Sequence, residues 1–323
     1  MSRPALVAPD SFKGTFSAPA VAGAIARGLR SGGREAVEMP VADGGEGTMD
    51  VLLAALGGER RTAMATDPLG RPVEAAFGLL PGGDTAVVET AQASGFALIA
   101  EHERDAWAAS TYGTGEVIAA AVAAGAERVI LTVGGSATSD GGGGAVAALD
   151  DAGVNPRLEL LCDVRTAFED APRVFGPQKG ADPAMVKRLE RRLSDLAQSA
   201  PRDPRGVPMT GCAGGLSGGL WAHRNAKLMP GAPFVLDAIG FHAVMRESAF
   251  VVTGEGALDE QTLQGKAAGE VATQSRQSGV ACHAVVGRND LEEFQQRVLD
   301  LVTVIEAGTE RELEAAGRRL AEP

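Results

Sequence analysis

The sequence predicts an α/β protein in which a Rossmann-like, parallel-sheet domain is discontinuous and carries an inserted second α/β domain. Strand, loop and helix patterns alternate at both ends of the chain, an order typical of βαβ units. The length of 323 residues exceeds the size at which one hydrophobic core usually stops growing. We expect residues 1–66 and 246–323 to form the Rossmann-like domain and residues 67–245 the insert, with the ligand cleft between them near strand carboxyl ends.

The N-terminal end shows the alternation clearly. Strands are predicted at 6–8 and 36–41, and helices at 20–30 and 47–56. In the first helix, apolar residues recur at helical spacing after Ser17, a suitable N-cap residue. Because each strand is followed by a loop and a helix, this end favours a parallel sheet.

The C-terminal end repeats the same order. Its predicted elements are strands at 248–253, 281–286 and 302–306, separated by helices near 266–276 and 291–299. Between the two ends, the predicted elements are strands at 73–79, 85–89 and 128–133 and helices at 115–124 and 182–199. The run of Val, Ile and Leu in the strand at 128–133 indicates burial.

The composition excludes several classes of partner. The formal net charge of −12 argues against nucleic acid, whose phosphates need clustered Lys and Arg. Three cysteines without Cys-x-x-Cys spacing favour reduced thiols in the cytosol. The N-terminus does not read as a signal peptide, and no apolar run reaches membrane-spanning length. We expect a cytoplasmic monomer or homodimer with no membrane or nucleic-acid partner.

Glycine-rich loops that follow strands are the strongest functional signal. Glycine lets a backbone approach a ligand closely and turn its amides inward. The standard P-loop and Gly-x-Gly-x-x-Gly patterns fail, so a dinucleotide oxidoreductase is poorly supported. The segment 134–144 follows a predicted strand and opens a helix, which suits the phosphates of a nucleoside triphosphate. The predicted nucleotide contacts are Gly134, Gly135, Ser136, Gly141, Gly142 and Gly143.

Charged residues in these loops are candidates for the chemistry. Asp140 can hold Mg²⁺, but an Asp beside a helix start is also a common cap, and the sequence leaves both roles open. Asp43 begins a glycine-rich bend just after a strand. Lys13 and Lys179 stand in glycine-containing loops, where each can meet a carboxylate or phosphate as a point charge. The four histidines are dispersed and show no metal-ligand spacing.

Taken together, these loops resemble the glycerate kinase family that includes bacterial glycerate 2-kinases. The matching segments follow family order across nearly the whole chain, at 8–14, 40–48, 68–70, 110–116, 134–143, 162–164, 175–181, 253–259 and 265–266. Two departures stand out. The segment 149–161 is shorter than in the family, and Ala257 stands where the family has an arginine.

The resemblance implies an enzyme that moves the γ-phosphoryl group of ATP, with Mg²⁺, onto a hydroxyl of D-glycerate to give 2-phosphoglycerate. We expect the ATP phosphates at 134–144, and D-glycerate near Ser11, Lys13, Asp43, Gly44, Gly45 and Lys179. Asp43 is the first choice for the catalytic base and Asp163 the second, and Asp140 or Asp259 holds the metal. The alternatives are a kinase for another small hydroxy acid or polyol, and a ligand-binding homologue without catalysis.

Overall fold

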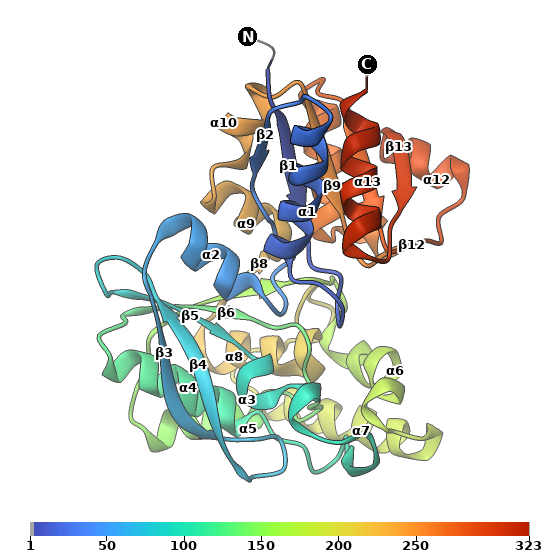
Figure 1. The fold of residues 1–323 in the computed structure, drawn as a ribbon. Coiled ribbons are helices and arrows are strands. Elements are labelled where there is room, and N and C mark those ends of the chain that lie inside the picture. The colour runs from blue at the N-terminus through green and yellow to red at the C-terminus, as the bar shows by residue number, and fades with distance from the viewer. Residues whose placement is uncertain (1–2, 323) are drawn as a thin grey trace. The chain divides into compact units, whose positions relative to one another are not determined.

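The computed structural model describes residues 3–322, which form two compact units (Figure 1). Unit 1 combines both ends of the chain, up to Asp43 and from Ala232 onward. Unit 2 is the continuous segment Gly44–Gly231. The predicted class, an α/β fold with a discontinuous parallel-sheet part and an inserted α/β part, is confirmed.

Unit 1 contains a five-stranded parallel sheet. Its strands, in spatial order, are β13 (Leu301–Glu306), β11 (Cys282–Val286), β9 (Phe250–Gly254), β1 (Ala5–Pro9) and β2 (Ala36–Glu38). Along β1, Leu6 and Ala8 pack into one core, whereas Ala5 and Val7 pack into another. A parallel strand covered on both faces buries both sets of alternating side chains, which explains why this segment is apolar throughout.

The helices of unit 1 are α1 (Ala18–Ser31), α9 (Gly231–Ala238), α10 (Phe241–Arg246), α11 (Ala267–Gln277), α12 (Glu293–Val298) and α13 (Glu310–Ala321), with one 3₁₀ turn, η6 (Thr262–Gln264). α1 and α13 lie side by side against the sheet (Figure 1). Gly28 allows their close approach, because a Cβ there would stand 2.0 Å from the carbonyl oxygen of Glu314. Two short strands, β10 (Ala257–Leu258) and β12 (Arg288–Asn289), also pair in parallel.

The sheet of unit 1 changes direction between β1 and β9. From β1 the chain moves outward to β2, and from β9 it moves outward on the other side to β11 and then β13. Such a reversal is a topological switch point, and open α/β sheets bind ligands in the crevice at the strand carboxyl ends there. The loops after β1 and β9 are therefore the first place to look for a site in this unit.

Unit 2 contains a mixed six-stranded sheet. Its order is β3 (Glu59–Thr66), β4 (Pro72–Leu79), β5 (Thr85–Glu89), β6 (Arg128–Thr132), β7 (Arg157–Cys162) and β8 (Lys227–Pro230). β4 is antiparallel to its neighbours β3 and β5, and β5 to β8 are parallel. The helices are α2 (Thr48–Leu56), α3 (Ala91–Ser94), α4 (Tyr112–Ala123), α5 (Gly143–Asp151), α6 (Ala171–Phe175), α7 (Pro183–Ser199) and α8 (Leu216–Arg224). Five 3₁₀ turns complete the unit, η1 (Phe96–Leu98), η2 (Glu101–Glu103), η3 (Phe168–Asp170), η4 (Pro177–Lys179) and η5 (Cys212–Gly215).

The division between the units falls at 43/44 and 231/232, whereas the sequence led us to expect 66/67 and 245/246. Segment 44–66 belongs to unit 2 because α2 packs on β4 and β5, and β3 is hydrogen-bonded to β4. The helices α9 and α10 belong to unit 1 because their apolar side chains enter its core. Among the described residues, no helix is both long and apolar enough to cross a bilayer.

Candidate functional site

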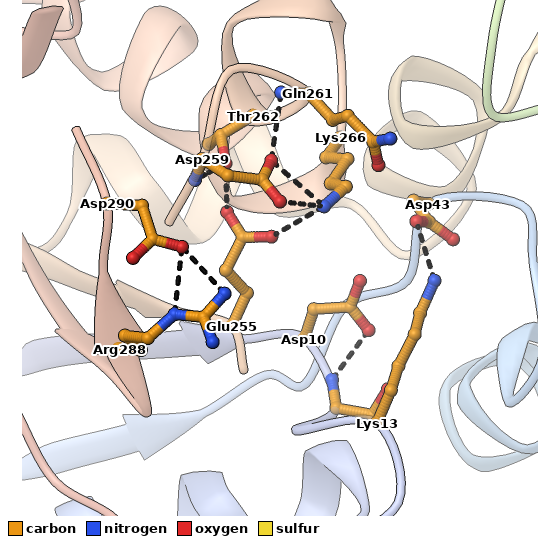
Figure 2. A network of polar contacts seen from close by, with 11 residues as sticks. Asp10, Lys13, Asp43, Glu255, Asp259, Gln261, Thr262, Lys266, Arg288 and Asp290 are labelled. Carbon is orange, nitrogen blue, oxygen red and sulfur yellow. Dashed lines mark hydrogen bonds and ion pairs between the residues drawn. The ribbon is translucent and has the colours of Figure 1, made fainter. Parts of the chain in front are cut away.

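Unit 1 carries a polar pocket of about 420 Å³ at the switch point of its sheet. Asp10 follows β1 directly, and Glu255 follows β9 directly, so the two neighbouring strands deliver both carboxylates to one pocket. Ser11 and Lys13, predicted as site residues, line the same pocket together with Asp43. Figure 2 shows how the charged side chains of these loops face one another.

Two neighbouring buried carboxylates define one side of this pocket. Asp10 is 6% exposed and Asp43 is 3% exposed. Burial, together with the nearby charge of Asp43, raises the pKa of Asp10 to about 8. The Asp10 carboxylate accepts a 2.6 Å hydrogen bond from the backbone N–H of Ser11. The ammonium of Lys13 lies 3.6 Å from Asp43 Oδ2, and its side chain is mostly exposed (Figure 2).

A second polar network on the other side of the pocket is centred on Lys266. Its ammonium lies 3.6 Å from Glu255 Oε2 and 3.3 Å from Asp259 Oδ1. Burial raises the pKa of Glu255 to about 7, while the hydroxyl of Thr262, which donates a 2.6 Å hydrogen bond to it, and Lys266 oppose that rise. Asp259, a predicted metal ligand, is already engaged by Lys266 and by the backbone N–H of Gln261 at 2.8 Å.

Unit 2 carries a smaller pocket of about 180 Å³ around Lys179. The turn η4 and the left-handed Gly180 that follows it place this lysine, which is only 2% exposed, inside the unit. Its ammonium donates to the carbonyl oxygen of Thr138 at 2.5 Å and to Ser136 Oγ at 3.1 Å. Burial lowers the pKa of Lys179 to about 7, although the nearby carboxylates of Asp140 and Asp163 act in the opposite direction.

Glycines form one wall of this second pocket. A Cβ on Gly134 would stand 2.7 Å from the Cα of Gly45 and 3.6 Å from Asp163 Oδ2, so only glycine lets these loops meet. Gly44 has a φ of +92°, and a Cβ there would stand 2.8 Å from another backbone Cα. The bends after β6 and β7 and before α2 therefore lie close together in unit 2.

The four-glycine run that opens α5 has a different role from the one we expected. The N–H groups of Gly142 and Gly144 donate to the Asp140 carboxylate at 3.1 Å each, and those of Gly141 and Gly143 donate to backbone carbonyls. Its amides do face an anion, but the anion is the Asp140 side chain. Gly141, Gly142 and Gly143 therefore present no unpaired amide to a nucleotide in this structure.

Asp140 itself is held by the same network, which bears on its expected role as a metal ligand. Its Oδ2 also accepts hydrogen bonds from both the backbone N–H and the hydroxyl of Thr111, each at 2.8 Å. Thr111 and Gly142 are the N-cap residues of α4 and α5, so one carboxylate serves two helix N-termini. Of the two roles that the sequence left open, this geometry favours the cap.

The predicted site residues thus fall into two sets. Unit 1 brings together Ser11, Lys13 and Asp43, with Asp259 in its second network, and unit 2 brings together Gly134, Gly135, Ser136, Asp163 and Lys179 beside Gly44 and Gly45. Asp10, Glu255 and Lys266 also line the unit 1 pocket, and they were not predicted as site residues. A signal was present, since Asp10 and Glu255 each stand two residues after an apolar run that we predicted as a strand.

Comparison with known proteins gives one consistent result. The model of the glycerate kinase family matches residues 5–157 and 151–321. A glycerate kinase of Halalkalibacterium halodurans is 38% identical over 321 residues, covering 87% of this chain and 84% of the relative. A glycerate 2-kinase of Escherichia coli is 37% identical over 300 residues, covering 81% and 79%. A crystal structure from Salmonella typhimurium LT2, provisionally assigned as glycerate kinase 2, superposes with a TM-score of 0.83 at 30% identity, covering 99% of this chain and 98% of that one.

Proposed function

The chain belongs to the glycerate kinase family, and from that premise we propose that it transfers the γ-phosphoryl group of ATP to the 2-hydroxyl of D-glycerate, giving 2-phosphoglycerate and ADP. The observation that carries the proposal is the buried carboxylate pair Asp10 and Asp43, with Lys13 beside it, at the switch point of the unit 1 sheet. A site of that composition suits the phosphate end of a metal-bound nucleotide.

Phosphoryl transfer asks little covalent chemistry of a protein. It needs positioned reactants, neutralised phosphate charge and a group that accepts the proton of the attacking hydroxyl. Lys13, Lys266 and Arg288 line the larger pocket and supply positive charge for phosphate oxygens. The candidates for the base remain Asp43 and Asp163, because each lines one of the two pockets.

The metal that such a reaction needs has suitable ligands in unit 1. Mg²⁺ in kinases usually takes one or two carboxylates plus substrate phosphates, and it keeps several waters. Asp10 and Asp43 fit, because two adjacent buried carboxylates are costly without a cation, as the raised pKa of Asp10 reflects. When bound, the ion would offset negative charge on the phosphates. Asp140 fits poorly, because its oxygens already accept four hydrogen bonds.

The decisive experiment identifies the product. The protein is incubated with D-glycerate and MgATP, and the phosphorylated acid is identified by ³¹P and ¹H NMR. We expect 2-phosphoglycerate, formed one-to-one with ADP. A product phosphorylated at the 3-position would overturn the proposed regiochemistry, and ATP binding without ADP formation would overturn catalysis. A panel of other hydroxy acids and polyols, run in the same ADP-release assay, tests the substrate assignment.

The cellular setting follows from the same proposal. ATP and reduced thiols are both features of the cytoplasm, and the three cysteines of the chain are all free and buried. We therefore place the enzyme in the cytoplasm as a monomer or homodimer. Fractionation of the source cells and sedimentation of the purified protein test the two parts of that placement separately.

A further inference from the structure

We propose that a groove between α7 and Trp107 is a second binding site of unit 2, and that it takes a phosphate monoester whose organic part carries a hydroxyl group. The groove has a volume of about 530 Å³. All of its lining residues belong to unit 2, and none of them lines the pocket around Lys179 or the pocket of unit 1. Binding at this groove is independent of the proposed function.

One face of α7 supplies most of the groove. Arg191 and Arg192 stand three and four residues after Arg188, and residues at these spacings in a helix are neighbours on one face. The face that packs into the core carries the buried side chains of Leu189 and Leu193. Because that packing fixes the rotation of the helix, the three arginines are held together on the outside of unit 2.

Trp107 holds two of these arginines in place. The guanidinium carbons of Arg188 and Arg192 lie 4.4 Å and 5.0 Å from the centroid of its indole ring. The Nη1 of Arg192 also donates a 2.8 Å hydrogen bond to the carbonyl oxygen of Trp107. A guanidinium stacked on an aromatic ring keeps its N–H groups at its edge, where they can meet an anion. Since the side chains are already ordered, less side-chain entropy is lost when a ligand binds.

The charge of the groove indicates the kind of ligand. Three guanidinium groups and the Asp195 carboxylate leave its lining two charges positive, in a chain whose formal net charge is −12. Within residues 3–322 none of the three arginines forms an ion pair, whereas Arg104 and Arg224 of the same unit each pair with a carboxylate. A phosphate monoester carries about 1.5 to 2 negative charges at pH 7. Arginine binds such a group through paired N–H···O bonds.

Asp195 distinguishes an ester from free phosphate. A carboxylate among the arginines repels a bare phosphate, but it accepts a hydrogen bond from a hydroxyl group. The volume of the groove also lies within the range of about 300–1,000 Å³ that is usual for small-molecule sites, so it has room for an organic part. We therefore assign the groove to a phosphorylated hydroxy compound.

Both walls of the groove are attached to the glycine-rich loop 140–144 that opens α5. Leu196 of α7 packs on Gly141, where a Cβ would stand 2.9 Å from Leu196 Cδ1. The other wall continues along the chain to Thr111, whose N–H and hydroxyl each donate a 2.8 Å hydrogen bond to Asp140. A ligand that joins the two walls therefore restrains this loop as well.

Titration calorimetry of the full chain with sn-glycerol 3-phosphate tests the site. Arg188→Gln and Arg192→Gln should each raise the Kd by about tenfold, because each removes a hydrogen-bonding partner of the phosphate that carries a charge. Lys187→Gln is the matched control. It removes the same charge from the exposed face of the same helix outside the groove lining, and it should change the Kd by less than about twofold.

The proposal is overturned if wild type, both arginine variants and the control bind sn-glycerol 3-phosphate with equal affinity, since the ester would then bind elsewhere. Absence of binding to the wild type would overturn it too. Circular dichroism of each variant checks that the fold is kept.

Inorganic phosphate separates the two parts of the ligand. We expect the wild type to bind it several-fold more weakly than the ester. Asp195→Asn should remove most of this difference, because it takes away the charge that repels free phosphate. If the wild type binds phosphate as tightly as the ester, the assignment to an ester is wrong.

Hydrogen exchange tests the attachment of the groove to the loop 140–144. Saturating sn-glycerol 3-phosphate should slow amide exchange there in the wild type and in Lys187→Gln, but not in Arg192→Gln at the same concentration. Unchanged exchange in a wild type that binds the ester would overturn the attachment. None of these measurements needs turnover, so an inactive enzyme would end the proposed function and leave the site standing.

Discussion

Replacing Asp140 by alanine tests whether this carboxylate holds the fold or a metal ion. The side chain is 3% exposed and accepts four hydrogen bonds, from the N–H groups of Thr111, Gly142 and Gly144 and from the Thr111 hydroxyl. Because Thr111 and Gly142 are helix N-caps, the carboxylate also lies at the positive ends of α4 and α5. Alanine would leave those donors buried without an acceptor.

The expected loss of stability follows from that count. A buried donor left unpaired costs about 1–3 kcal/mol, and hydrogen bonds to charged groups lie at the upper end. Three amides and one hydroxyl would give a larger sum, but water can enter the space and satisfy some of them. We therefore expect Asp140→Ala to lower the free energy of unfolding of unit 2 by about 4 kcal/mol or more. Asp140→Asn keeps one acceptor oxygen, so it should cost about half as much.

Urea unfolding followed by circular dichroism measures these losses. Asp195→Ala, which removes an exposed carboxylate from α7 of the same unit, is the matched control and should change the unfolding free energy by less than about 0.5 kcal/mol. The opposite result would be an Asp140→Ala protein that is as stable as the control yet needs far more Mg²⁺ for activity. That pair of results would make Asp140 a metal ligand after all.

Three further predictions concern the base, pH and packing. Asp163→Asn should lower kcat by about 10²–10⁴-fold without loss of folding. Asp43→Asn should mainly raise the Mg²⁺ concentration needed for half-maximal rate. If steady-state kinetics give the opposite pattern for the two variants, Asp43 is the base. Burial raises the pKa of Glu255 to about 7, so the stabilising contribution of Glu255 is fully present near pH 4.5 and below and is lost as pH rises to 7. Glu255→Gln should therefore make the unfolding free energy at pH 7, relative to that at pH 4.5, about 2 kcal/mol more favourable than in the wild type, and an unchanged difference would assign the effect elsewhere. Gly28→Val should destabilise unit 1 by several kcal/mol in thermal unfolding, because the Cβ of the valine would overlap the carbonyl of Glu314. If the variant melts at the same temperature as the wild type, α1 and α13 can separate at this position without cost.

The sequence was most informative where one physical signal dominated. The strand predicted at 128–133 and the helix predicted at 182–199 match β6 and α7 within one residue at each end, because a continuous apolar run and an Asp-Pro helix start admit few alternatives. β3 was not predicted. It is an exposed edge strand with charged residues at its start, so neither burial nor alternation marks it. Its hydrogen bonds to β4, which no local pattern reveals, decide that segment 59–66 belongs to unit 2.

The candidate site could be predicted by residue type but not by grouping. Lys179 was selected from its glycine-containing loop, yet its contact with Ser136 spans 43 residues and depends on how two loops fold together. The glycine run before α5 was selected as an anion cradle, and the sequence itself contained the competing anion, Asp140, one residue earlier. Local patterns therefore identify donors and acceptors, while only the fold shows which of them are already paired.

The discontinuity of unit 1 has a consequence for protein synthesis. β1 lies beside β9, and the hydrogen bond from Thr253 to Ala8 joins residues 245 positions apart. At translation rates of about 5–20 residues per second, the strand made first waits roughly 10–50 seconds for its neighbour to leave the ribosome. Unit 2, by contrast, is one uninterrupted stretch, so its sheet can assemble while the nascent N-terminal strands still lack β9. Chaperones that shield short apolar segments would act on those strands during that interval.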